Sequence, residues 1–418
     1  MKGENKMKRM LKGLGLGVAL ATLMAAPGMA QTVLDFPSWQ TEDKSFQPWW
    51  QSVIAAFEAE HPDVKVQMSM VPFADYVSQL TVRFASNNPP DIVHLPSRNF
   101  AAFAANGWLA PLDDRLAETD ILENWSPLQA SMEWDGSTQG VLLMGYGNVL
   151  FYNQDLLDQA GLSVPTTPDE LLAAVDAITD VDAGVFGFGG VTTEHPNVGT
   201  EIASWVIAQG QNFFKDDAYN FTDPAVVAAV DKYRHAIKQA PAGVATAQLN
   251  QLFADGKIGM MMSGPWHWVA SQQADGTWVP HARMGAVPFE ITTGGVSNGL
   301  HVAAATPSEK QDLAWEFIKF ATQPEFMASY TASTYSPAAR VGALTEEAIA
   351  ADPVLKYVAD AAAVAVDTHP TNPTVQANYN EYANLLMQAG IRLQTTDDAT
   401  ETVLSDLQAE LERRIPLN

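Results

Sequence analysis

The feature that most constrains the fold is the alternation of short strands with helices along the chain. Val33–Phe36 predicts a first strand, and a helix pattern follows with Val53 and Phe57 on one face. Residues 64–70 then alternate apolar with polar side chains, which is typical of a strand with one solvated face. The same order repeats further along the chain. Because strands separated by helices form parallel sheets covered on both faces, the sequence predicts an α/β fold.

One predicted strand ends at a proline that is followed by two tryptophans. Residues 258–262 form a uniformly apolar run, which predicts a strand buried on both faces. Ser263-Gly264-Pro265 ends it, because Pro265 has no amide hydrogen to donate. Trp266 and Trp268 therefore follow the carboxyl end of a strand, where open α/β sheets bind their ligands. A tryptophan face suits the C–H face of a ring-shaped polar ligand, although Trp268 fits core packing equally well.

The first thirty residues have the composition of a secretory signal peptide. A basic start, residues 2–12, precedes the apolar run 14–26, and Gly28-Met29-Ala30 offers a cleavage site before Gln31. The run is too short for a membrane anchor, since a span needs about 20 residues. The chain contains no cysteine, so a disulfide framework and a lipid-anchored cysteine are not expected. We expect a soluble periplasmic protein without a lipid anchor.

Charge and motif content narrow the possible partners. The formal net charge is −25, the opposite sign from that of a polybasic nucleic-acid or anionic-membrane binder. With 418 residues, about two domains are expected. Neither a metal-ligand spacing nor a nucleotide-binding glycine pattern occurs after the signal peptide. We therefore expect no nucleic-acid partner, no metal and no cofactor.

Six short motifs, in order along the chain, resemble a known family. This family is that of the extracellular solute-binding proteins of family 1, the sugar-binding group that includes maltose-binding protein. The motifs are Phe57–Val64, Asn88–Val93, Asn106–Leu112, Leu150–Leu156 with Ala160-Gly161, Pro165–Leu171 and Ser263–Trp266.

The resemblance implies an α/β fold of two lobes, each a mixed, mostly parallel sheet flanked by helices. Residues 31–143 plus 300–336 would form the N-terminal lobe, and residues 144–299 plus 337–418 the C-terminal lobe. Three hinge crossings would join them, near residues 143–147, 297–302 and 335–339. A monomer of this kind closes on a carbohydrate and delivers it to the permease subunits of an ATP-binding-cassette importer.

The same resemblance implies where the ligand is held. Aromatic residues would supply flat apolar faces, while Asn, Gln, Ser and Arg would satisfy sugar hydroxyls, with the guanidinium of Arg98 able to contact two of them. The candidates are Trp39, Gln40, Ser97, Arg98, Asn99, Tyr146, Asn148, Gly264, Trp266, Trp268, Asn298, Tyr335, Arg340 and Tyr379. Trp205 is expected to pack in a helix core.

Two alternatives stay open. One is a receptor for a polyol or glycerol phosphate, of which the phosphate would call for a second Arg or Lys beside Arg98. An exported hydrolase could use Ser297, which stands in a G-x-S-x-G pattern with Asp367 and His369 downstream. That pattern requires a strand-to-helix turn, whereas a strand is expected to follow Ser297. We therefore expect no catalytic residue and no enzymatic activity.

Overall fold

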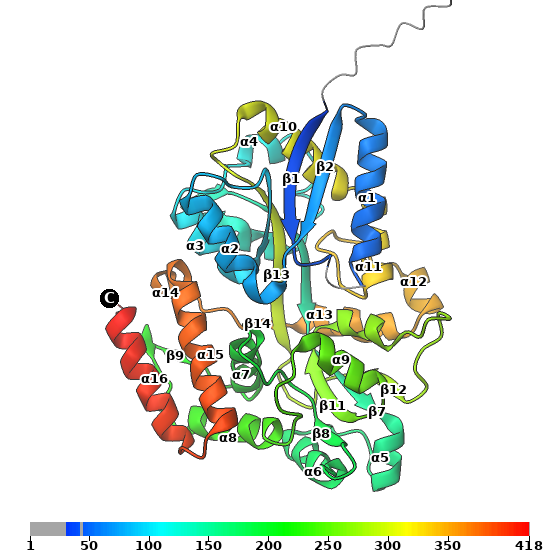
Figure 1. The fold of residues 1–418 in the computed structure, drawn as a ribbon, viewed down its shortest axis with the longest axis vertical. Helices are drawn as coiled ribbons and strands as arrows, with labels where there is room; N and C mark the ends of the chain where they lie inside the picture. The colour runs from blue at the N-terminus through cyan, green and yellow to red at the C-terminus, as the bar shows by residue number, and fades with distance from the viewer. Residues whose placement is uncertain (1–30, 42–44, 418) are drawn as a thin grey trace, which may run out of the picture.

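A computed structural model describes residues 31–41 and 45–417. The predicted signal peptide and its cleavage site, residues 1–30, lie outside the described residues. The chain forms two lobes that lie one above the other, with the N-terminal strands in one and the C-terminal helices in the other (Figure 1). The described part of the chain contains no helix long and apolar enough to cross a membrane.

The N-terminal lobe is built around two sheets. Strands β1 (Thr32–Ser38) and β2 (Val64–Met70) pair in parallel, and β3 (Ile92–Pro96) lies beside the long strand β13 (Thr293–Val302). Short strands β4 (Glu133–Trp134) and β5 (Ser137–Thr138) form a hairpin. The helices of this lobe are α1 (Gln47–Glu60), α2 (Phe73–Ala85), α3 (Ser97–Ala105), α4 (Asp113–Leu116), η1 (Pro127–Met132), α10 (Ser308–Ala321) and α11 (Pro324–Thr334).

The C-terminal lobe contains a four-stranded sheet in the order β12-β7-β11-β8. Its strands are β7 (Val149–Asn153), β8 (Phe186–Phe188), β11 (Ile258–Ser263) and β12 (Ala282–Gly285), with the hairpin β9 (Phe214–Lys215) and β10 (Ala218–Tyr219) apart. The helices are α5 (Gln154–Ala160), α6 (Pro168–Ile178), α7 (Asn197–Ala208), α8 (Pro224–Ile237), α9 (Thr246–Ala254), η2 (Pro265–Ser271), α12 (Glu346–Ala351), α13 (Val354–Val364), α14 (Pro373–Ala377), α15 (Tyr379–Thr395) and α16 (Thr400–Arg414).

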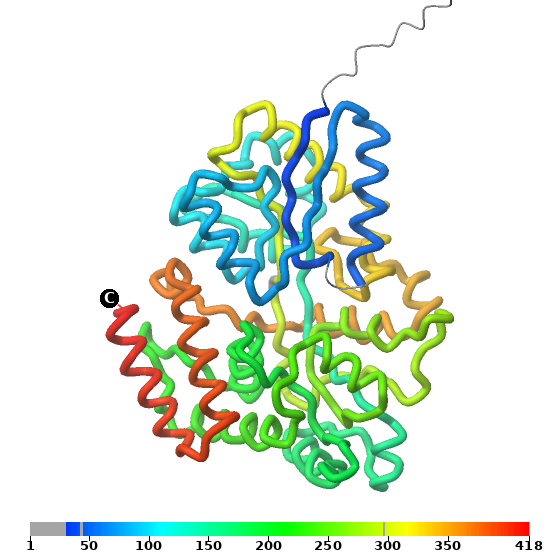
Figure 2. Tube along the Cα trace, viewed as in Figure 1, coloured from blue at the N-terminus to red at the C-terminus, as the bar shows by residue number. Residues whose placement is uncertain are grey.

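Two long strands carry the chain between the lobes. β6 (Val141–Gly147) descends from the N-terminal lobe and continues into β7, while β13 ascends beside it (Figure 2). β13 also pairs in parallel with β14 (Val366–Asp367). The first two expected crossings, residues 143–147 and 297–302, lie within β6 and β13. Near the third, Tyr335 packs with the C-terminal core whereas Ala339 packs with the N-terminal core.

The sheets are mixed, as predicted, but the expectation that they are mostly parallel is wrong. The parallel pairs are β1–β2, β8–β11 and β13–β14, whereas β7 is antiparallel to both β11 and β12. β13 is antiparallel to β3 and β6. The cause is the connection between the lobes, because strands that carry the chain out and back must run in opposite directions.

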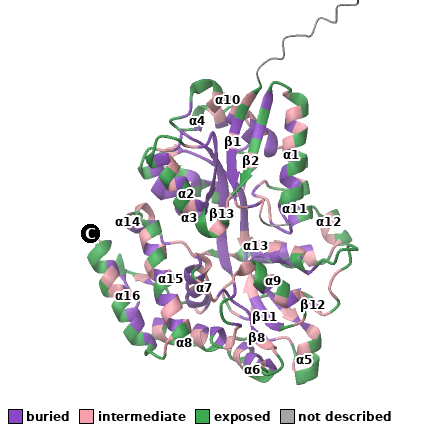
Figure 3. Cartoon of the chain, viewed as in Figure 1, coloured by how far each residue is buried: buried purple, intermediate pink, exposed green. Residues whose placement is uncertain are grey.

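Each lobe has its own apolar core. Phe36, Trp50 and Phe317 lie in the N-terminal core, whereas Phe221 and Tyr233 lie in the C-terminal one. Buried residues follow most strands, whereas β2 is largely exposed, as are the outer faces of the helices (Figure 3). The central strand β11 has Ile258 and Met260 fully buried, as the apolar run predicts.

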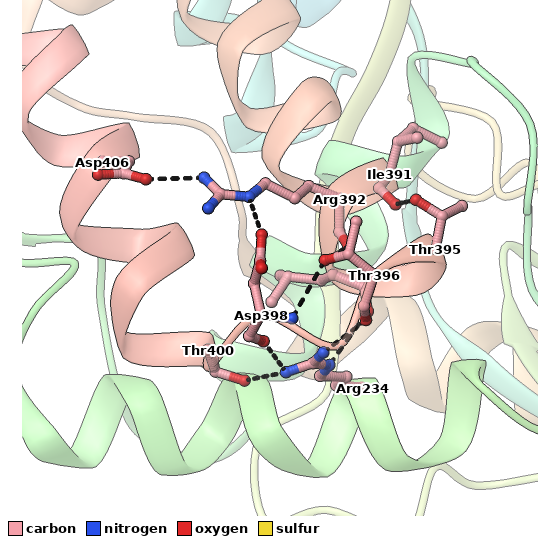
Figure 4. Close-up of polar contacts among 9 residues, drawn as sticks. Arg234, Ile391, Arg392, Thr395, Thr396, Asp398, Thr400 and Asp406 are labelled. Atoms are coloured by element: carbon pink, nitrogen blue, oxygen red, sulfur yellow. Dashed lines mark hydrogen bonds and ion pairs between the residues drawn. The ribbon is translucent and has the colours of Figure 1, made fainter.

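One arginine links helix α8 to the turn between helices α15 and α16. Arg234 of α8 donates to the carbonyl oxygens of Leu393, Thr396 and Asp398 at 3.1, 2.8 and 2.6 Å, and to the hydroxyl of Thr400 at 3.2 Å (Figure 4). Leu393 lies in the last turn of α15, where carbonyl groups lack partners within the helix, and Thr396 and Asp398 lie just beyond its end. α8 is thereby joined to the turn between α15 and α16.

The crossing strands approach their neighbours at backbone distance. A Cβ atom on Gly147 would lie 2.2 Å from the carbonyl oxygen of Ala361 in α13. A Cβ atom on Gly294 would lie 2.1 Å from the carbonyl oxygen of Tyr146. Both distances are far inside van der Waals contact, so glycine is required at each position for this packing.

Candidate ligand-binding cleft

A cavity of about 1080 Å³ lies between the lobes. Its N-terminal wall contains Trp39 and Arg98, and its C-terminal wall is formed largely by α7, α9 and η2. The crossing strands close it at the back, through Tyr146 of β6 and Asn298 of β13. Both lobes and the strands that cross between them therefore contribute side chains to the same cavity.

Trp39 is held in place by a buried histidine. Its ring stacks on His94 at 4.1 Å between centroids and an interplanar angle of 17°. His94 Nε2 lies 2.8 Å from Asn298 Oδ1, and its Nδ1 lies 2.8 Å from Ser38 Oγ. Burial lowers the pKa of His94 to about 3, so the imidazole is neutral. It donates to Asn298 through Nε2 and accepts from Ser38, which fixes the cleft-lining Trp39 and Asn298.

Gln40 reaches the cleft with its amide already bonded. Trp50 Nε1 donates to Gln40 Oε1 at 2.8 Å, and Gln40 Nε2 donates to the Tyr330 hydroxyl at 3.4 Å. The side chain is 1% exposed. Gln40 therefore supports the shape of the wall and has little free hydrogen-bonding capacity.

The lobes touch each other at the mouth of the cleft. Arg98 Nη1 of α3 donates to Thr200 Oγ1 of α7 at 3.0 Å, and its guanidinium lies 5.2 Å from the centre of the Phe73 ring. Phe73 also contacts His195 of the opposite lobe, at 5.8 Å between ring centroids. Burial, together with the charge of Arg98, lowers the pKa of His195 to about 4. The conformation is thus one in which the two walls face each other closely.

Trp266 presents a partly exposed indole to the cavity. The indole folds back over Gly264, where an added Cβ would lie 2.0 Å from the ring. Tyr146 meets it edge-on at 4.9 Å between centroids. The Ser45 hydroxyl of the N-terminal lobe donates to the Trp266 carbonyl at 3.2 Å. Burial raises the pKa of Tyr146 to about 12, so its hydroxyl keeps its proton.

Sequence reasoning missed one face of α7. Residues spaced three or four apart turn toward the cavity, and the four polar ones are Asn197, Thr200, Glu201 and Ser204. Val198, Ile202 and Val206 on the other faces are buried. A polar stripe at helical spacing on an otherwise apolar helix is the pattern that could have revealed this wall. Thr246 and Asn250 of α9 add to it.

Trp205 packs in the core and also borders the cavity. It is 2% exposed and packs edge-on against Phe188 and Phe289, as expected of a core residue. It also belongs to the cavity wall, beside Ser204.

The structure brings eight of the fourteen candidate residues into the cavity wall. They are Trp39, Gln40, Arg98, Tyr146, Asn148, Gly264, Trp266 and Asn298. That they contact a ligand stays a prediction.

Three further candidates, Trp268, Tyr335 and Arg340, lie outside the cavity wall. Trp268 is 4% exposed and stacks on Trp278, so it packs in the core. Tyr335 ends α11 and donates its hydroxyl to Asp352.

Arg340 is engaged on the other side of the N-terminal lobe. It pairs with Asp120 and lies over the Trp125 ring. Its guanidinium is therefore satisfied away from the cleft.

Ser97, Asn99 and Tyr379 lie beside the cleft rather than in its wall. Asn99 donates to the Asn380 side chain at 2.6 Å, which joins α3 to α15 across the lobes. Tyr379 is buried against Tyr382, and Ser97 is 9% exposed. Their position fits a role in lobe contact.

The geometry around Ser297 differs from that of a hydrolase. Ser297 lies inside β13, not on a strand-to-helix turn. Asp367 and His369 form a pair at 3.0 Å, and His369 lines the same cavity. Within the described residues, however, the Ser297 hydroxyl is bonded to the Asn298 amide and not to His369. Residues 31–41 and 45–417 also contain no group of three or more His, Asp or Glu suited to a metal ion.

Comparisons with known proteins agree with this architecture. The family model described as bacterial extracellular solute-binding protein matches residues 43–328. The diacetylchitobiose binding protein DasA of Streptomyces coelicolor is 27% identical over 352 residues, covering 81% of this chain and 79% of its own. The galactooligosaccharide-binding protein of Bacillus subtilis is 26% identical over 261 residues, 56% of each chain.

A solved structure gives the same result for the fold. The maltose-bound MalE3 of T. maritima superposes with a TM-score of 0.80 at 18% identity, covering 92% of this chain and 99% of its own. At this identity the match establishes the fold. The prediction of a two-lobed α/β binding protein is confirmed.

Proposed function

Since the chain belongs to the bacterial extracellular solute-binding proteins, we propose that it is a receptor that closes on a carbohydrate and delivers it to an ATP-binding-cassette importer. The observation that supports this most is the composition of the cavity wall. Aromatic faces from both lobes, Trp39, Tyr146 and Trp266, surround the same space as neutral polar side chains. A sugar has the same two kinds of surface, C–H faces and hydroxyls.

Polar groups at the back of the cleft are suited to hydroxyls. Asn148 donates to Thr293 Oγ1 at 3.0 Å and lies 3.5 Å from Ser204 Oγ. Each of these hydroxyls can both donate and accept. A cavity of about 1080 Å³ is slightly larger than ordinary ligand pockets, roughly 300–1,000 Å³, which favours an oligosaccharide over a single ring.

The relatives support the carbohydrate class, since two of them are described as binding diacetylchitobiose and galactooligosaccharide. The polyol or glycerol-phosphate alternative has weaker support. A phosphate ester would call for more than one cation, and Arg98 is the only Arg or Lys among the described residues of the cavity wall. Its guanidinium already donates to Thr200.

The cellular setting belongs to the same proposal. Residues 1–30 would direct export and be removed, leaving a periplasmic monomer without a lipid anchor. Closure would shift an existing balance of open and closed forms by the ligand's preference for the closed one. The closed shape is what the permease subunits would recognise, and no bond of the sugar would be broken.

A ligand screen tests the proposal. The protein without residues 1–30 would be heated with mono- and oligosaccharides, polyols and phosphate esters, each in excess. A bound ligand raises the melting temperature by mass action, about 2.7 kcal/mol of stability at 100 times its Kd. Stabilisation by a saccharide with the sugar recovered intact supports the receptor. Stabilisation by phosphate esters alone, or turnover of a glycoside or ester, would contradict it.

A further inference from the structure

A small side pocket adjoins the main cavity in the C-terminal lobe. Its volume is about 20 Å³, which is room for one water-sized group. Glu201 of α7 and Thr246 and Asn250 of α9 line both this pocket and the main cavity. A substituent of a ligand in the cleft could therefore enter it, whereas a sugar ring could not.

Two oxygen atoms in this pocket are buried without a partner. Glu201 Oε1 accepts a hydrogen bond from the Val191 backbone at 3.2 Å, but Glu201 Oε2 has none. Asn250 Oδ1 is also buried and unbonded. Buried polar atoms are nearly always satisfied in folded proteins, so two unsatisfied oxygen atoms beside a ligand cavity indicate a missing hydrogen-bond partner.

The pocket keeps the carboxyl group out of water. Val191, Leu249 and Met261 contribute apolar walls. Gly190 leaves the necessary room, because a Cβ there would lie 3.1 Å from Glu201 Oε2. Burial raises the pKa of Glu201 to about 8, so the carboxyl carries its proton at neutral pH when the cleft is empty.

Among the described residues, no lysine or arginine lines the side pocket. The other titratable groups that face Glu201 are His267 of η2 and Tyr233 of α8, and burial holds the pKa of Tyr233 well above its usual value. A permanently charged partner for the carboxylate would therefore come from the ligand.

We infer that the Glu201 side pocket is a subsite for a protonated amino group, so that the sugars bound in the cleft include amino sugars. This inference rests on the proposed function. An ammonium group has three N–H donors and can satisfy Glu201 Oε2 and Asn250 Oδ1 together, whereas a hydroxyl has one hydrogen and can satisfy one of them. When the ammonium enters, Glu201 releases its proton to solvent and a carboxylate–ammonium pair forms, while the ligand keeps its charge.

The experiment uses matched sugar pairs that differ by one amino group. Glucosamine and glucose, and galactosamine and galactose, are titrated by calorimetry below neutral pH into the protein without residues 1–30. At least one amino member should bind about ten-fold or more tightly than its hydroxyl counterpart. Its binding should release about one proton, seen as a heat that changes with the ionisation enthalpy of the buffer.

Two variants distinguish an effect of the side pocket on binding from an effect of the protein's overall charge. Glu201→Gln has the same shape but cannot ionise, and it should abolish both the preference and the proton release. Glu194→Gln removes a carboxylate that is exposed in the preceding loop, and it should change neither. Equal or tighter binding of the hydroxyl sugars, or a preference that survives Glu201→Gln, would overturn the inference while leaving the carbohydrate receptor intact. If no saccharide of either kind binds, the proposed function fails first.

Discussion

At the scale of single residues, two tryptophans separated by one residue have different roles. Trp266 is partly exposed in the cleft, whereas Trp268 is stacked in the core. Trp266→Ala should weaken binding of the sugar found in the screen by about 10- to 100-fold, since about 1.5–3 kcal/mol of apolar contact is lost. Trp268→Ala should instead lower stability by about 3–5 kcal/mol. Calorimetric titration and thermal unfolding of both variants would show whether the two effects separate; a ligand affinity unchanged in Trp266→Ala would contradict this assignment.

Glu201 also predicts a pH dependence of stability. Its pKa is raised from 4.5 to about 8 in the folded protein, so the stabilising contribution of its protonated form is complete below pH 4.5 and is lost as the pH rises through 8. The unfolding free energy of the parent protein should fall relative to Glu201→Gln by up to about 1.4 kcal/mol per pH unit.

The comparison should be made between about pH 6.5 and 8. Burial lowers the pKa values of His94, His195 and His301, and these groups have the opposite effect on stability below 6.5. Urea unfolding of both proteins across the range provides the measurement. Parallel curves for the two proteins would mean that Glu201 is ionised throughout.

Site residues could be predicted from the sequence where their position depends on neighbouring residues in the chain. Trp266 could be placed because Pro265 ends a buried strand directly before it. Glu201 and Thr200 could not, because their orientation depends on how α7 is placed against the opposite lobe. Tyr335 and Arg340 were misplaced for the same reason, since their partners, Asp352 and Asp120, belong to segments whose position the sequence does not reveal.

At the scale of elements, the Arg234 junction should contribute strongly to the C-terminal lobe. Arg234→Met removes the donors that join α8 to the end of α15 and leaves several carbonyl groups without partners. We expect a loss of about 2–4 kcal/mol, seen as a lower urea midpoint. Arg413→Met is the control, because Arg413 makes an exposed pair with Glu410 within α16 and should change stability by less than about 0.5 kcal/mol. Equal effects of the two substitutions would contradict the junction's role.

Element positions were more predictable than strand directions. The apolar periodicity of residues 64–70 and the uniform run 258–262 each gave the observed strand. Strand direction, however, follows from the path of the chain between lobes. β6 and β13 cross in opposite senses, and no local pattern in either strand records that.

At the scale of the whole molecule, the glycines of the crossing strands should control how the lobes meet. Gly147→Ala would place a methyl group 2.2 Å from the Ala361 carbonyl oxygen, so α13 must move away from β6. We expect a loss of about 1–3 kcal/mol in stability together with weaker ligand binding. Gly285→Ala is the control, because its nearest neighbour, a Tyr152 ring carbon, would lie at an ordinary 3.4 Å. Normal stability and affinity in Gly147→Ala would show that the hinge tolerates displacement.

The interleaving of the lobes along the chain has a consequence for biogenesis. The N-terminal core includes Trp315, Phe317 and Tyr330, and the C-terminal core includes residues of α16. Neither core can be completed from the first part of the polypeptide, so a fragment ending before residue 300 should show no cooperative unfolding. A nascent chain that cannot complete either lobe early stays unfolded until late in synthesis, which would suit the export proposed for it.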